Sequence, residues 1–130
     1  MPDREPFTFE ERARSFRYAW HGIVRLVVTQ HNAWIHATAT VAVVLAGALA
    51  GVSRLDWALL VFALVAVWSA EALNTAVEAL GDAVSRDEHT LVGVAKDVAA
   101  GAVLVAAVGA VVIAGLVFWP HVAHLAGLAR

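Results

Sequence analysis

Three long apolar segments separated by short polar turns dominate the pattern of this chain. Asp, Glu, Lys and Arg are absent from residues 26–53, 57–70 and 98–129. An α-helix needs about 20 apolar residues to cross the roughly 30 Å hydrocarbon core of a bilayer. The pattern therefore predicts membrane-spanning helices at about residues 33–52, 57–84 and 92–119. The last is expected to end at Pro120, because proline lacks the N–H that continues a helix.

The segment before the first span, at about residues 8–30, is amphipathic. Apolar side chains recur along one helical stripe. A second stripe is basic and consists of Arg14, Arg17, His21 and Arg25. Thr8 and Glu11 have the spacing of a capping box at a helix start. This pattern predicts a helix lying in the membrane interface, with arginines toward anionic headgroups. A soluble helix docked on a partner is the alternative.

Composition and charge agree with a membrane protein. The 130 residues are 61% hydrophobic and 15% charged, whereas soluble domains are roughly half apolar. Cysteine is absent, which excludes disulfides and thiolate metal sites. Basic residues precede the first span and flank the loop after the second, so the positive-inside rule places the N-terminus and this loop in the cytoplasm. We expect a disordered tail at residues 1–7 and a single domain at residues 8–130.

The second span carries a stripe of polar residues: Glu71, Asn74, Glu78 and Asp82. Spacings of three and four residues place them on one helix face over about 16 Å. Ionisable residues inside a membrane cost several kcal/mol each and are normally functional. Two carboxylates together with phosphate oxygens suit Mg²⁺. More charged residues gather near the ends of the second and third spans: Asp87, Glu88, His89, Lys96 and Asp97.

Each of these features also has a simpler interpretation. Glu71 alone fits a proton-coupling site in a transporter. Asp82, Lys96 and Asp97 also fit solvated charges or anchors at helix ends. The histidines near span ends are interpreted as interfacial residues without a ligand role: His31, His36, His121 and His124. Trp68 lies away from the span ends and is assigned only to packing. The combination of polar residues favours catalysis.

Several segments resemble the bacterial diacylglycerol kinase and undecaprenol kinase family of small integral-membrane lipid kinases. They are residues 15–22, 32–36, 71–82, His89 and 95–104. The resemblance covers about residues 12–119, and its most specific part is the Glu-x-x-Asn-x-x-x-Glu-x-x-x-Asp pattern followed by Ala-Lys-Asp. The Asn-x-x-Ile-His spacing at Asn32 is more similar to the undecaprenol kinases of Gram-positive type.

The resemblance implies a homotrimer of three-span protomers, each with a surface helix, and active sites shared between protomers. It implies that Glu71 is the general base, that Asn74 orients the reacting groups and that Glu78 holds Mg²⁺. It also implies a set of nucleotide-binding residues: Tyr18, Asp82, Asp87, Glu88, His89, Lys96 and Asp97. A GxxxxGK[ST] phosphate loop is absent from the sequence, and the family does without one.

Two positions depart from the family pattern. Many members carry a second metal-binding glutamate where this chain has Gln30, which offers only a neutral carbonyl oxygen. We therefore expect looser metal binding at Gln30 or a water-mediated role there. Trp34 replaces a basic residue often found in the family, which weakens the expected contact with the lipid headgroup.

These observations predict an ATP- and Mg²⁺-dependent kinase of a membrane lipid hydroxyl at the cytoplasmic face of the bacterial inner membrane. Undecaprenol is favoured as acceptor over diacylglycerol. The expected partners are the lipid, ATP, the bilayer and further copies of the chain, with no nucleic acid. A small proton-coupled exporter using Glu71 is the rival function, and a catalytically silent assembly protein is a third.

Overall fold

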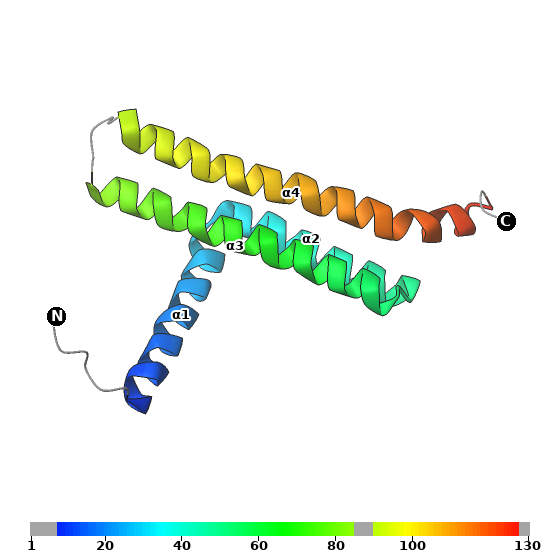
Figure 1. Cartoon of the computed structure of the whole chain (residues 1–130), viewed down its shortest axis with the longest axis horizontal. Coiled ribbons are helices and arrows are strands. Elements are labelled where there is room, and N and C mark those ends of the chain that lie inside the picture. The colour runs from blue at the N-terminus through cyan, green and yellow to red at the C-terminus, as the bar shows by residue number, and fades with distance from the viewer. Residues whose placement is uncertain (1–7, 85–89, 128–130) are drawn as a thin grey trace.

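The protein is an arrangement of four helices. The computed structural model describes residues 8–84 and 90–127, and in them the chain is helical and has no strand, which confirms the predicted all-α class. The helices are α1 Phe9–Thr29, α2 His31–Ala50, α3 Arg54–Val84 and α4 Thr90–Leu125. The last three are long and apolar enough to cross a membrane. Figure 1 shows these three helices running in roughly one direction, while α1 leaves them at a steep angle.

Helix α1 begins at a capped end and finishes at a sharp break. The Thr8 hydroxyl accepts a hydrogen bond from the Glu11 N–H at 3.4 Å, which is one half of the expected capping box. Gln30 adopts an extended conformation between α1 and α2, with φ −97° and ψ 122°. Leu26 is the buried residue of α1, whereas Phe9, Phe16, Trp20 and Ile23 of its apolar stripe are exposed. Such a helix can place that stripe against a membrane interface.

The turn between α2 and α3 is tight because of one glycine and one serine–aspartate pair. Gly51 ends α2 in the left-handed conformation at φ 66°, which glycine adopts without a Cβ penalty. The Asp56 carboxylate accepts hydrogen bonds from the Ser53 N–H at 3.1 Å and the Ser53 hydroxyl at 2.7 Å. A Cβ on Gly47 would lie 2.9 Å from the Trp57 ring, so Gly47 is the surface on which this tryptophan packs.

Helices α3 and α4 make the most extensive contact in the molecule and lie side by side in Figure 1. Leu60, Val52 and Val117 form the buried apolar cluster near one end of this pair. Near the other end the side chains of Val92 and Lys96 lie directly against Gly81. Elsewhere large apolar side chains point outward, as expected for helices whose solvent is lipid.

The helix of the third predicted span does not end at Pro120 as expected, because α4 continues to Leu125. Proline removes one backbone hydrogen bond, and membrane helices tolerate it when the surroundings compensate. The helix ends instead before Gly127, which has φ 69° and whose N–H donates to the His124 carbonyl at 3.1 Å. The local signal for the end was therefore the left-handed glycine.

Candidate active site

Glu71 and Asn74 are the buried polar residues of the described chain. Glu71 is 1% exposed and Asn74 is 6% exposed. They continue the buried face of α3 that contains Leu60, Ala63 and Val67, since all five residues recur at helical spacings of three and four. The face that packs against neighbouring helices therefore changes from apolar to polar at Glu71.

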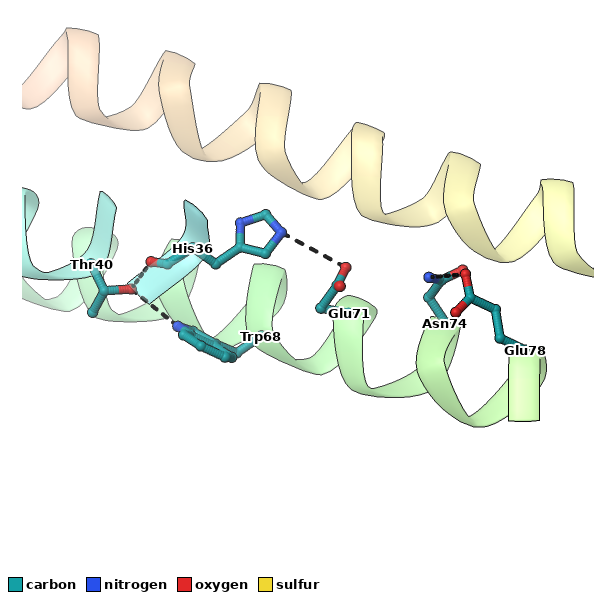
Figure 2. Close-up of polar contacts among 6 residues, drawn as sticks. All are labelled: His36, Thr40, Trp68, Glu71, Asn74 and Glu78. Carbon is teal, nitrogen blue, oxygen red and sulfur yellow. Dashed lines mark hydrogen bonds and ion pairs between the residues drawn. The ribbon is translucent and has the colours of Figure 1, made fainter. Parts of the chain in front are cut away.

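The Glu71 carboxylate faces a histidine from α2. His36 Nε2 lies 3.7 Å from Glu71 Oε2, and the His36 side chain is largely buried. Figure 2 shows the imidazole and the carboxylate pointing toward each other in the space between α3 and α4. The distance is longer than a hydrogen bond but within the range of an ion pair. Within the described residues, Oε2 has no hydrogen-bond partner.

Behind His36, a threonine and a tryptophan join α2 to α3. Trp68 Nε1 donates to the Thr40 hydroxyl at 3.0 Å, and this hydroxyl donates to the His36 carbonyl at 2.7 Å. The His36 and Trp68 rings meet edge to face, with centroids 6.2 Å apart. Trp68 lies one turn before Glu71 on α3. The structure thus gives Trp68 a hydrogen-bonding role that its sequence position did not reveal.

One turn beyond Glu71, Asn74 pairs with the second carboxylate of the stripe. Asn74 Nδ2 donates to Glu78 Oε1 at 3.2 Å (Figure 2). Asn74 Oδ1 is buried and has no partner among the described residues. A buried amide oxygen without a donor is costly, so this atom is suited to a ligand or cation. Asn74 and Glu78 together present oxygen atoms one and two turns beyond Glu71 on α3.

The stripe ends in an exposed ion pair between α3 and α4. Lys96 Nζ lies 2.5 Å from Asp82 Oδ1, and the two side chains are 35% and 72% exposed. Asp97 follows on α4 and is exposed. Two of the predicted nucleotide-binding residues therefore bind each other, within reach of water and of any soluble ligand.

The remaining predicted residues are not brought to the stripe by described contacts. Tyr18 is exposed on α1, where the Arg17 guanidinium lies 5.8 Å from its ring centroid. Gln30 is half-buried at the break between α1 and α2, and its N–H donates to the Leu26 carbonyl. The segment of the predicted residues Asp87, Glu88 and His89 lies outside the described residues.

The oxygen atoms of Asn74 and Glu78 suit a Mg²⁺ ion that is bound together with a phosphate, not one that is coordinated by protein side chains alone. Within the described ranges, no group of three His, Cys, Asp or Glu side chains converges on one point. Mg²⁺ commonly uses one or two carboxylates, keeps several waters and takes its other oxygens from substrate phosphates. Glu78 with the unpartnered Asn74 Oδ1 can supply such a partial set of ligands.

His36 is the site residue that sequence reasoning missed. We expected an interfacial histidine without a ligand role, and the structure places it against Glu71 instead. A signal was present: Asn32, His36 and Thr40 recur every four residues, which forms a polar stripe on a mainly apolar helix. Which helix this stripe would face depends on tertiary packing.

Comparison with known proteins identifies the family. A family model described as prokaryotic diacylglycerol kinase matches residues 17–118. Diacylglycerol kinase of Synechocystis sp. is 41% identical over 85% of this chain, which spans 64% of that relative's length. Undecaprenol kinase of Bacillus subtilis is 38% identical over 82% of this chain and 87% of its own length. Diacylglycerol kinase of Escherichia coli K12 is 34% identical over 80% of this chain and 85% of its own.

The matched region contains all of α2 and α3 and the Glu71, Asn74 and Glu78 positions. It ends within α4, close to Pro120. Because the family model covers most of the chain, the chain belongs to the prokaryotic diacylglycerol kinase family, a family of membrane lipid kinases.

Proposed function

We propose that the protein is an ATP- and Mg²⁺-dependent kinase that phosphorylates the hydroxyl of undecaprenol. Diacylglycerol is the second candidate acceptor. The observation that carries this proposal is the fully buried Glu71 carboxylate on a membrane-spanning helix, followed one and two turns later by the hydrogen-bonded Asn74–Glu78 pair. A carboxylate without water around it is suited to accept the proton of a lipid alcohol.

In this proposal Glu71 takes the proton of the lipid hydroxyl as its oxygen attacks the γ-phosphorus of ATP. The new O–P bond forms while the bond from the γ-phosphorus to the bridging oxygen breaks, and ADP leaves. Glu78 and Asn74 would hold the Mg²⁺ that accompanies ATP, and Gln30 would be a weaker oxygen ligand. Bound Mg²⁺ would neutralise phosphate charge, which is a large part of catalysis in phosphoryl transfer.

The nucleotide-binding residues in this proposal lie at the loop end of α3 and α4. Lys96 contacts phosphate oxygens after it leaves Asp82, and Asp97 lies beside it. Asp82, Tyr18, Asp87, Glu88 and His89 complete the proposed nucleotide site. The mixture of exposed charges on α3 and α4 suits a charged cosubstrate arriving from water, whereas Glu71 suits an acceptor arriving from lipid.

We also propose a homotrimer in the bacterial inner membrane with the N-terminus in the cytoplasm. Two features support an assembly. Large apolar side chains on the three spans are uncovered by this chain, and Gly101, Gly109 and Gly115 on α4 have open space at their Cβ positions. Small residues allow helices of neighbouring copies to approach closely. Residues from a neighbouring copy would then complete the nucleotide site.

The choice of acceptor rests on α2. The Asn32-to-His36 segment resembles the undecaprenol kinases more than the diacylglycerol kinases, and its histidine lies at the proposed base. Overall identity does not decide the acceptor, since relatives named for diacylglycerol and for undecaprenol are 41% and 38% identical. The comparisons give no support to a transporter.

The deciding experiment is phosphate transfer by the purified protein in detergent. Labelled ATP is offered with undecaprenol, diacylglycerol or ceramide, with Mg²⁺ and with the metal chelated. We expect labelled undecaprenol phosphate as the main product, and no product after chelation. Transfer mainly to diacylglycerol would overturn the acceptor, and transfer to none of the lipids would overturn the kinase proposal.

A further inference from the structure

The mechanism proposed above requires that the Glu71 carboxylate be held in one orientation. A glutamate has three rotatable side-chain bonds, and a misplacement of about 1 Å at a reacting group can cost about 100-fold in rate. Yet Oε2 of Glu71 is buried without a hydrogen-bond partner among the described residues, and the group facing it is His36.

His36 is itself fixed in place from two sides. Its ring meets the Trp68 ring edge to face, and its carbonyl accepts a hydrogen bond from Thr40, which in turn accepts one from Trp68. Trp68 and Glu71 lie on the same face of α3, one turn apart. The contacts therefore run from α3 through Thr40 and His36 on α2 and return to α3 at Glu71, as Figure 2 shows.

We infer that His36 is a positioning residue for Glu71. In this inference, which rests on the proposed kinase function, His36 Nε2 carries the ring proton and donates it in a hydrogen bond to Glu71 Oε2. The carboxylate is thereby oriented so that Oε1 receives the proton of the lipid hydroxyl. The observed 3.7 Å separation shortens when the acceptor is bound, because hydrogen bonds of catalytic groups are often long before substrate binds.

Thr40 and Trp68 also help to orient Glu71, but they act through their contacts with His36. Replacement of the Trp68 indole by a phenyl ring removes the donor to Thr40 but keeps an aromatic edge beside His36. Trp68→Phe is therefore expected to lower turnover less than any variant that removes the imidazole. A smaller loss of turnover in Trp68→Phe than in variants without the imidazole would show that His36 orients Glu71 and does not only fill space.

The first test compares two substitutions of His36 by steady-state kinetics on purified protein with ATP and undecaprenol. His36→Gln retains an N–H donor close to the Nε2 position, and His36→Phe retains ring volume without a donor. We expect His36→Phe to lower kcat about 10- to 100-fold, as the loss of a hydrogen bond to a charged group would. KM for ATP should stay unchanged, and His36→Gln should recover most of the rate. His121→Gln, at a half-buried histidine on α4, is the matched control.

The second test does not need turnover. Nitrogen NMR of histidine-labelled protein locates the His36 Nε2 signal as the one lost in His36→Gln. We expect Glu71→Gln to shift this signal and to leave the other histidine signals in place. An unshifted signal, or a His36→Phe variant with unchanged kcat, would overturn the positioning role. A wild-type protein that transfers phosphate to no lipid would instead overturn the kinase proposal, while the NMR result still decides the contact.

Discussion

Glu71 and Asp82 lie on the same stripe of α3, about three turns apart, and Asp82 pairs with Lys96 of α4. The two carboxylates differ in their exposure to water and in their partners. Glu71 is shut from water and faces a largely buried histidine. Asp82 and Lys96 form a close ion pair that remains open to solvent. One helix can therefore present one carboxylate in a buried environment and another in water. Its buried part can handle a proton, and its exposed part can bind a charged, soluble molecule.

The energetic consequences of the two environments are opposite. A buried charge depends on the few groups around it, so loss of one partner has a large effect. An exposed ion pair contributes little to stability, because water and salt screen it. Substitutions near Glu71 should therefore change the chemical step, and substitutions near Lys96 should change nucleotide affinity.

The largest effect is expected from Glu71→Gln. This change keeps the side-chain volume and removes the proton acceptor, so kcat should fall about 1,000-fold while the fold is retained. Phosphate transfer by purified protein measures the rate, and thermal unfolding measures the fold. Glu10→Gln, on the exposed face of α1, is the control and should have wild-type activity. A Glu71→Gln variant with substantial turnover would show that Glu71 is not the general base.

Glu78→Gln should give the next largest effect. The glutamine oxygen can still accept the Asn74 hydrogen bond, so the variant removes charge with little change of structure. We expect the Mg²⁺ concentration for half-maximal activity to rise about 10- to 100-fold, as for changes around a metal ligand. Titration of activity with Mg²⁺ measures it. Thr75→Val, beside Asn74, is the control, and an equal shift in that variant would argue against metal binding by Glu78.

Lys96→Met tests the role of the exposed ion pair between Lys96 and Asp82. Methionine retains the apolar stem that crosses Gly81 and removes the ammonium group. KM for ATP should rise about tenfold, the size of a charge-assisted hydrogen bond, with kcat nearly unchanged. Asp82→Asn frees Lys96 from its partner and should change KM for ATP less. If Lys96→Met lowered kcat alone, the proposed separation between chemistry and nucleotide binding would be wrong.

Much of this arrangement could be predicted from local sequence, and the rest required tertiary structure. Apolar runs and helical spacing predicted the all-α fold, the three long helices and the shared face of Glu71 and Asn74, because these depend on periodicity alone. The contact of His36 with Glu71 joins two helices, and spacing within α2 cannot decide which neighbour its polar stripe faces. The expected helix end at Pro120 was wrong because a single missing hydrogen bond does not end a helix in a membrane.

The smallest effect is expected at Gln30, which lies at the break between α1 and α2. Gln30→Glu adds a carboxylate at this break, and a negative oxygen binds Mg²⁺ more tightly than an amide oxygen. We expect the Mg²⁺ requirement to fall about three- to tenfold with little change in kcat. Activity is titrated with Mg²⁺ in the wild type, in Gln30→Glu and in Gln30→Ala. An unchanged requirement in Gln30→Glu would show that this break in the chain lies outside the metal site.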